Sequence, residues 1–288
     1  MAKARSLRTS EVVTRMVRAA AADVRDTLPA ALRDEPDAVH EHRTRVRRLR
    51  AVLAGVSRYV DAPAARRLRD EYREWGHSLG VVRDLEVRAE QADAALTDAD
   101  VDDADAWRRL VGREREQYVV EHARLEQQAS FTAATKRARR LERFAAEPHA
   151  RGGKARKDLR RVLQHEIKRV RRAKRAYDGR LETQHELRKA GRRLRYIAEA
   201  IGTQAPGLFE VSHLVAAGKG VHDALGEQRD ALLLVARLRL ARAAADAAGE
   251  AVAPYEQLTE AAESRASDHA KGLKPALKQL RRGAKAIS

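Results

Sequence analysis

Two eleven-residue segments of this chain are nearly the same, although half of the sequence separates them. Residues 40–50 have the sequence HEHRTRVRRLR and residues 185–195 have HELRKAGRRLR, with seven identical positions at an offset of 145 residues. A second pair follows in the same order, since LGVVRDLEV begins at Leu79 and LGEQRDALL begins at Leu225, an offset of 146 residues. Two motifs that recur together and in order indicate an internal duplication. The fold of the first half should therefore recur in the second.

Helical periodicity runs through almost the whole chain, and no segment shows the alternating apolar pattern typical of β-strands. Prolines and glycines divide this pattern into segments. We therefore predict an all-α fold in two halves of four helices each, residues 1–150 and residues 151–288. The predicted helices span residues 10–32, 37–60, 63–96, 104–128 with a continuation to 146, 154–178, 181–203, 207–247 and 254–285.

The net charge restricts the class of partner. Lys and Arg total 59 against 42 Asp and Glu, which gives +17 at neutral pH, and a field of that sign attracts polyanions rather than metal cations. The excess is uneven, because residues 1–150 carry 29 basic and 26 acidic side chains whereas residues 151–288 carry 30 and 16. We therefore expect the second half to supply most of the attraction.

Features that the sequence lacks exclude further classes. It has no cysteine, so neither a disulfide framework nor a thiolate metal site can form. The acidic stretch before Trp107 alternates aspartates like a calcium loop, but Asp103 stands where that loop needs glycine and Arg109 where it needs glutamate. No apolar run approaches the roughly 20 residues of a membrane span, and the first residues lack the apolar core of a secretory signal. We expect a cytoplasmic protein without bound metal or cofactor.

The first repeated motif places one histidine and three arginines on one side of a helix, within an arc of about 80° at 100° per residue. These basic stripes are His40, Arg43, Arg47 and Arg50 in the first half and His185, Arg188, Arg192 and Arg195 in the second. Guanidinium groups form paired, charge-assisted bonds to phosphate and stay charged at any working pH. A histidine beside phosphate is favoured in its protonated, donating form. The stripes therefore predict a site for a repeating phosphate anion.

The second repeated motif is interpreted as support for the stripes. Gly80 and Asp84 lie four residues apart on one helix face, as do Gly226 and Asp230. The glycines admit a close helix neighbour, and the aspartates are expected to hold stripe arginines in position. Other basic side chains are expected to contact the ligand or widen the site: Arg83, Arg229, His165, Lys168, Arg172, Arg175, Lys274, Lys278, Arg281, Lys136 and Arg140.

The order of these motifs resembles the CHAD family, the conserved histidine α-helical domain, over residues 10–285. The resemblance implies two pseudo-twofold-related four-helix bundles that form one unit around a basic central cleft or pore. It also implies binding of inorganic polyphosphate and localisation at polyphosphate granules. The positions that match the family's histidine and basic residues are His40, Arg43, Arg47, Arg48, Arg50, His185, Arg188, Lys189, Arg192, Arg193 and Arg195.

Two positions depart from an even distribution of charge between the halves. Thr44 stands opposite Lys189, and Asp23 stands near the place that Lys168 occupies in the second half. Some family members are fused to a triphosphate-tunnel phosphatase domain with an E-x-E-x-K strand, and this chain has no such segment. We therefore expect a binding module and not an enzyme, with the oligomeric state left open.

Three other functions remain as alternatives. A basic groove also binds the phosphate backbone of duplex nucleic acid, although aromatic residues are only 4% and offer no stacking row for single strands. A histidine phosphotransfer protein also carries its histidine on a four-helix bundle, but needs one solvent-facing histidine. The Glu74–His77 and Glu182–His185 spacings fit a carboxylate di-metal bundle, but the arginines beside His185 oppose a divalent cation.

Overall fold

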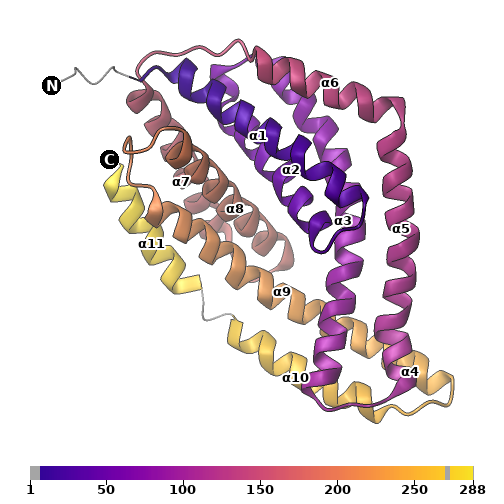
Figure 1. The fold of residues 1–288 in the computed structure, drawn as a ribbon. Helices are drawn as coiled ribbons and strands as arrows, with labels where there is room; N and C mark the ends of the chain where they lie inside the picture. The colour runs from indigo at the N-terminus through magenta and orange to yellow at the C-terminus, as the bar shows by residue number, and fades with distance from the viewer. Residues whose placement is uncertain (1–6, 270–272, 288) are drawn as a thin grey trace.

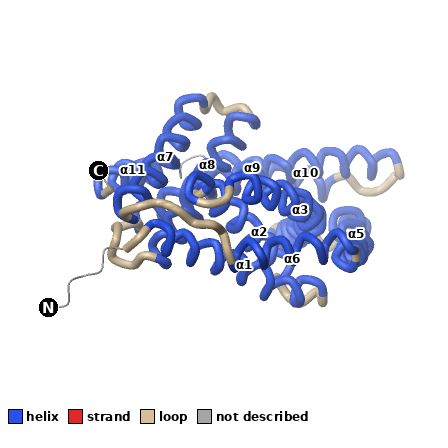
Figure 2. Tube along the Cα trace, turned by 90° about the horizontal axis from the view of Figure 1, so that it is seen from above, coloured by secondary structure: helices blue, strands red, loops and turns tan. Residues whose placement is uncertain are grey.

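The computed structural model describes residues 7–269 and 273–287, and every regular element in these ranges is a helix (Figure 1, Figure 2). The one extended pairing there is an isolated bridge between Arg8 and Lys154, which ties the start of the first helix to the start of the second half. These observations confirm the prediction of an all-α fold.

The helices of the first half follow the predicted order. They are α1 (Thr9–Leu32), α2 (Ala38–Gly55), a 3-10 turn (Ser57–Tyr59), α3 (Ala62–Asp98), α4 (Ala104–Trp107), a π-helical turn (Arg108–Gly112), α5 (Arg113–Ser130) and α6 (Thr132–Ala146). The segment predicted as one helix from residue 104 to 146 therefore has several parts. Phe131 adopts an extended conformation between α5 and α6, and this break lets α6 fold back along α1 and α3.

The second half is also helical, with two differences from the prediction. Its helices are α7 (Ala155–Ala176), α8 (Leu181–Gln204), α9 (Ser212–Ala247), α10 (Ala253–His269) and α11 (Leu273–Ala286). α9 begins five residues later than predicted, because Gly207 takes a φ of 74° in the turn that follows α8. The predicted helix over 254–285 is two helices, and residues 270–272 between them lie outside the described ranges.

The apolar side chains form two clusters. The larger one includes Leu49 and Leu53 of α2 together with Leu194 and Ile197 of α8, and helices of both halves contribute to it. The smaller one forms at the far ends of α3 and α9, where they meet α10 and the π-helical turn (Figure 1). The larger core therefore joins the two halves into one packed body.

α2 and α8, which carry the first repeated motif, pack against each other within the larger core. Gly55 of α2 faces Ile197 of α8 so closely that a Cβ atom at residue 55 would overlap the isoleucine side chain. α3 covers α2, and α9 covers α8. This packing brings the two basic stripes, one from each half, into the same region of the molecule.

Candidate anion-binding site

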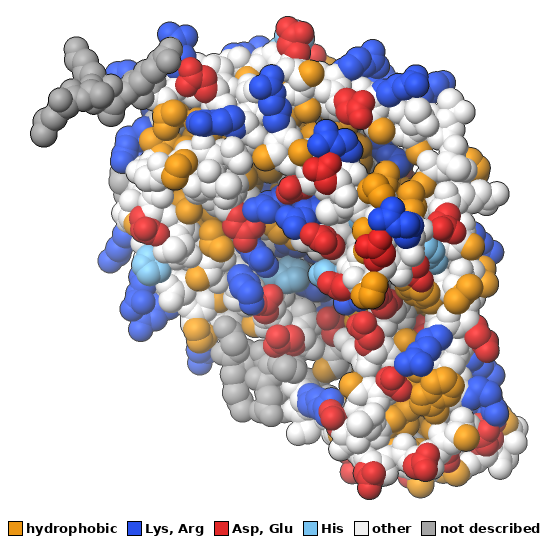
Figure 3. Space-filling model, viewed as in Figure 1, with side chains coloured by type: hydrophobic (Ala, Val, Ile, Leu, Met, Phe, Trp, Pro, Cys, Tyr) orange, Lys and Arg blue, Asp and Glu red, His pale blue; other side chains and the backbone are white. Residues whose placement is uncertain are grey.

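Four arginines meet where α2 packs against α8, and they are named here the central arginine cluster: Arg43, Arg47, Arg188 and Arg192. Burial lowers the pKa of Arg47, and the charges of Arg43 and Arg188 lower it further. Burial also lowers the pKa of Arg192, followed by the charge of Arg47. Poorly hydrated cations that repel one another are unfavourable unless an anion joins them. Figure 3 shows basic side chains and histidines at the middle of one face, with acidic side chains among them.

The cluster also contains hydrogen-bond donors without acceptors. The Nε atoms of Arg43, Arg47 and Arg188 are buried and have no hydrogen-bond partner within the described ranges. A buried donor that lacks an acceptor costs about 1–3 kcal/mol. An anion with several oxygens would accept from these donors and offset both the missing bonds and the mutual repulsion. The charges and the unpartnered donors of the cluster are therefore unfavourable for the unliganded fold.

A cavity of about 220 Å³ opens beside the cluster, and it is named here the basic cavity. Seven of its lining side chains are basic, and one is a carboxylate. The charged and aromatic lining residues are Arg47, Arg50, Arg69, Arg169, Glu186, Lys189, Arg192, Arg193 and Tyr196. The structure thus brings five of the predicted binding residues into one cavity, together with residues from α3 and α7.

Arg69 and Arg169 line the basic cavity but were not predicted from the sequence. Burial lowers the pKa of Arg69, and the charge of Arg193 lowers it further. At the repeat offsets, Arg69 corresponds to Val215 and Arg169 to Val24. Neither arginine has a basic counterpart in the other half, so the internal repeat contained no signal for them.

Residues of the second repeated motif lie against arginines of the first. A Cβ atom at Gly80 would lie 3.3 Å from Nη2 of Arg43, and one at Gly226 would lie 3.2 Å from Nη2 of Arg188. Each glycine therefore leaves room for an arginine of the central cluster against the neighbouring helix. The carboxylate of Asp84 lies 3.7 Å from the Arg43 guanidinium.

Asp230 occupies the equivalent place in the second half. Its carboxylate lies 3.9 Å from the guanidinium of Arg229. Burial raises the pKa of Asp230, and the charge of Arg188 opposes that rise. The acidic group of each LGxxRD motif therefore acts electrostatically on the arginines beside it.

The surroundings of the histidines that begin each motif disfavour their protonated form. Burial lowers the pKa of His40, and the charge of Arg83 lowers it further. Burial lowers the pKa of His185 as well, followed by the charge of Lys189. Neighbouring cations contribute at both positions, so an anion bound among them would reverse part of the effect.

His222 of α9 faces the cluster and was not predicted. Burial lowers its pKa, and the charges of Arg188 and Arg192 lower it further. Its Nε2 atom is buried without a hydrogen-bond partner in the described part of the chain. Gly76 stands at the corresponding position of the first half. The sequence did hold one signal, because His222 lies four residues before Gly226 and shares its helix face.

Four predicted binding residues of α2 and α8 form ion pairs of 3.0 Å or less with carboxylates of the protein. One is Lys189, whose Nζ lies 2.8 Å from Glu186, and the other three are arginines. The shortest distances are 3.0 Å from Arg48 to Glu199, 2.7 Å from Arg195 to Glu199 and 2.7 Å from Arg193 to Glu166. Glu166 is 1% exposed, so Arg193 is the counter-ion of a buried charge. These arginines lie close to the central cluster, but part of their hydrogen-bonding capacity is already used.

The remaining predicted basic residues lie outside the central arginine cluster. Arg83 pairs with Glu86 at 2.8 Å, and Arg140 pairs with Glu71 at 2.8 Å. None of the other predicted basic side chains on α6, α7 and α11 lines the basic cavity, and all are exposed. These are Lys136, His165, Lys168, Arg172, Arg175, Lys274, Lys278 and Arg281. They form outer basic rows on the surface.

The second histidine of the first motif has a different place. His42 is 0% exposed, its Nε2 accepts a hydrogen bond of 2.9 Å from Trp75 Nε1, and its Nδ1 lies 2.9 Å from the Thr27 hydroxyl. Burial lowers the pKa of His42 to about 4. The ring is therefore neutral and belongs to the core, whereas His40 two residues earlier lies at the edge of the site.

The described residues lack the features of two other classes of protein. They contain no group of three or more His, Asp or Glu side chains that could hold a metal ion. In the same ranges, none of the helices combines the length and the apolarity needed to cross a bilayer.

Comparison with known proteins identifies the family. Residues 15–239 match the CHAD domain family, and the chain belongs to it. Among solved structures, the fold resembles the CHAD domain from the plant Ricinus communis, with a TM-score of 0.73 and 21% identity over 97% of this chain and 95% of that chain. It also resembles PptA from Streptomyces chartreusis, with a TM-score of 0.68 and 19% identity over 97% and 100% of the two chains. A search of curated proteins finds no match.

Proposed function

We propose that this protein binds inorganic polyphosphate at the central arginine cluster and the basic cavity. Membership of the CHAD family is consistent with a polyphosphate-related function. The observation that carries the proposal is the convergence of half-buried guanidinium groups from α2 and α8, among them Arg47 and Arg188, whose buried Nε donors lack acceptors in the described ranges. The protein acts as a binding module, and binding serves to target it to polyphosphate granules or to organise them.

The chemistry of polyphosphate matches this arrangement. A linear chain of phosphates presents oxygens at regular intervals, so one molecule can accept from several arginines in a row. Guanidinium groups form two parallel bonds to phosphate, and electrostatic attraction is stronger in a poorly hydrated cavity than at an open surface. The lysine and arginines that line the basic cavity continue the path of the chain beyond the cluster.

The proposal is tested by titration with polyphosphate over a series of salt concentrations. Since bound arginines replace counter-ions, the logarithm of the binding constant should fall linearly with the logarithm of salt concentration. Arg47→Gln combined with Arg192→Gln should weaken binding at least about tenfold, because each residue lost removes charge-assisted bonds.

The matched control combines Arg139→Gln with Arg171→Gln, which removes the same net charge from exposed positions outside the basic cavity. It should change affinity little. Equal losses in the two double variants would show that only net charge matters, and the site would then be misplaced.

Duplex nucleic acid remains the competing polyanion, because exposed basic rows on α7 and α11 are accessible to a wide ligand. The basic cavity, at about 220 Å³, suits a single phosphate chain and not a duplex. Competition between polyphosphate and duplex DNA at matched phosphate concentration distinguishes them. If DNA displaces polyphosphate efficiently, and variants of the outer rows weaken both ligands equally, nucleic-acid binding is the better description.

A further inference from the structure

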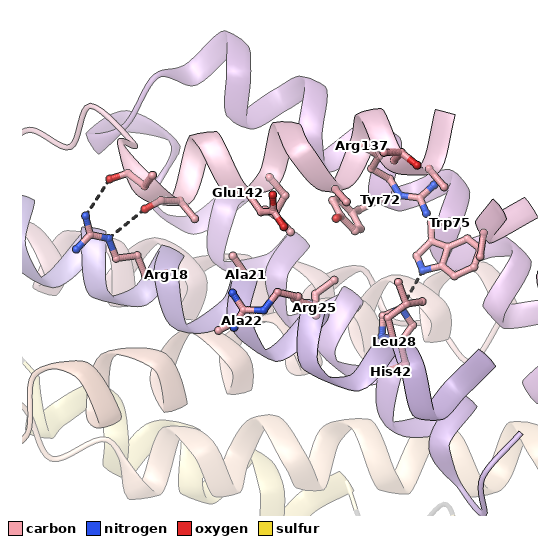
Figure 4. A pocket seen from close by; sticks show the side chains of 18 residues that line it. Arg18, Ala21, Ala22, Arg25, Leu28, His42, Tyr72, Trp75, Arg137 and Glu142 are labelled. Atoms are coloured by element: carbon pink, nitrogen blue, oxygen red, sulfur yellow. Dashed lines mark hydrogen bonds between the residues drawn. The ribbon is translucent and has the colours of Figure 1, made fainter. Parts of the chain in front are cut away.

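A second cavity, of about 610 Å³, lies between α1 and α6 (Figure 4). Its size falls within the usual range for small-molecule sites, roughly 300–1,000 Å³. The floor is buried and includes Tyr72, Trp75 and Leu141, whereas Arg25 and Glu142 at the rim are exposed. This α1–α6 groove shares no lining residue with the basic cavity.

The groove exists because small side chains line the space between α1 and α6, whereas larger groups fill this space at both ends. Arg18 of α1 donates hydrogen bonds to the terminal carbonyls of α6, at 3.1 Å to Ala145 and 2.8 Å to Ala146. Toward the other end, the indole and phenol rings of α3 fill the space. Between these ends the walls include Ala21 and Ala138, which leave an apolar volume unfilled.

The shape of the groove favours a linear ligand. Its lining runs along α6 from residue 134 to residue 146, which corresponds to about 18 Å at 1.5 Å per residue. Apolar atoms dominate the floor, and polar groups occur at its ends and rim. A long and mostly apolar cavity of this kind fits an extended hydrocarbon chain better than a compact polar molecule.

Arg137 of the groove has no carboxylate partner in the described part of the chain, and it contacts aromatic rings instead. The guanidinium of Arg137 lies 4.7 Å from the Trp75 ring centroid and 5.5 Å from that of Tyr72. Glu71, the acidic group that acts on it from α3, is already paired with Arg140 at 2.8 Å. Burial lowers the pKa of Arg137, so an anion beside it would be favourable.

The other charged groups of the groove leave this end positive. Arg25 pairs with Asp26 at 2.8 Å, and the guanidinium of Arg18 donates to backbone carbonyls. Glu142 is the one carboxylate in the lining, and it lies about 8 Å further along α6 than Arg137, because five residues separate them. His42 is uncharged and bonded to Trp75.

We propose that the α1–α6 groove binds a free, single-chain fatty carboxylate, with its hydrocarbon chain between the alanines and its carboxylate at Arg137. The apolar floor excludes water from the chain, and the guanidinium recognises the head group by a paired, charge-assisted bond. The stacked rings hold the guanidinium in place before the ligand arrives. This site is separate from the polyphosphate site, and neither depends on the other.

Trp75 makes the proposal measurable. The chain has two tryptophans, and Trp107 is exposed on α4, beside the smaller core cluster rather than the groove. In a Trp107→Phe background, an ω-bromoalkanoate of roughly the length of the groove should quench Trp75 fluorescence in a saturable manner. Adding Ala138→Phe should abolish quenching by filling the groove, and adding Arg137→Gln should weaken it about tenfold.

Matched controls keep the test specific. Ala133→Phe and Arg139→Gln alter exposed positions of α6 outside the lining, and both should quench normally. An ω-bromoalkanol of equal length should bind at least about tenfold more weakly than the acid. Polyphosphate affinity should be unchanged in all variants, so failure here is distinguishable from failure of the proposed function.

Three results would overturn the proposal. These are undiminished quenching in Ala138→Phe, equal quenching by acid and alcohol, and quenching that requires lipid vesicles. The last would indicate a membrane surface and not a free fatty carboxylate. Because Ala138 is exposed, the Ala138→Phe variant is expected to fold. Circular dichroism of this variant and of Arg137→Gln checks the folding of each separately.

Discussion

At the scale of single residues, arginines of the same motif have different roles according to what surrounds them. Arg47 and Arg188 have buried Nε donors without partners in the described ranges, whereas Arg48 and Arg195 share the carboxylate of Glu199. A guanidinium that is already paired gains less from a new anion than one that is not. Ligand binding should therefore depend most on the unpaired arginines, although the motif contains all of them.

The histidines that begin the motifs are predicted to couple polyphosphate binding to proton uptake. In the free protein, burial and neighbouring cations lower the pKa values of His40 and His185 from about 6.5. A bound polyanion raises both values, so the complex holds protons that the free protein lacks. Affinity should rise as pH falls through the bound-state pKa and level off below the free-state pKa. Titrations at about pH 5 and about pH 8 measure this difference.

Replacing both histidines with glutamine should flatten this pH profile and keep much of the affinity, because the arginines stay charged throughout. His165→Gln on the outer surface of α7 is the control and should retain the slope. A double variant with the original slope would exclude His40 and His185 as the titrating groups.

At the scale of helices, the geometry of the site depends on close approach. Gly80 of α3 and Gly226 of α9 accommodate guanidinium groups from α2 and α8. Glycine inside a helix costs roughly 0.5–1 kcal/mol relative to alanine. Glycine at these two positions therefore lowers helix stability but leaves space beside the central arginine cluster.

Substituting alanine at both glycines should affect stability and binding in opposite directions. The free energy of unfolding should stay the same or rise, since helix propensity improves and each new Cβ meets the flexible end of an arginine. Polyphosphate affinity should fall about threefold or more, because displaced guanidinium groups lose bidentate geometry. Denaturant unfolding and titration measure the two effects, and Val81→Ala on α3 is the control. Unchanged affinity would show that these glycines serve helix packing alone.

At the scale of the whole molecule, the two halves share one core and one cluster of arginines. Leu49 of α2 and Leu194 of α8 belong to the same apolar cluster, and the central arginine cluster takes two residues from each helix. The net charge of the second half is much larger, but many of its basic groups lie on exposed rows away from the cavity.

The cluster predicts similar contributions from the two halves at close range. Arg43→Gln with Arg47→Gln, and Arg188→Gln with Arg192→Gln, should weaken polyphosphate binding within about threefold of each other, because all four guanidinium groups meet in one place. Salt titration of both double variants provides the measurement. A much greater loss from the second pair would favour the sequence-based expectation, in which the uneven overall charge decides the affinity.

The fold class and the faces of the helices that carry arginine follow from local sequence alone. Helical periodicity predicted the all-α fold, and the repeated motifs predicted the stripes on α2 and α8, because both depend on side-chain spacing along a single helix. The break at Phe131 escaped prediction, since tertiary packing and not local pattern decides where a long helix is interrupted.

Only the tertiary structure decided which basic residues share a cavity. Arg69, Arg169 and His222 reach the basic cavity or the central arginine cluster from three other helices and lie outside the repeated stripes. Arg48 of α2 is paired with Glu199 of α8, which Arg195 of the same helix also contacts. The sequence by itself determined the helices and the faces on which arginine lies. The crossing of those helices determined which arginines remain unpaired, because burial and pairing are properties of contacts between segments far apart in the chain.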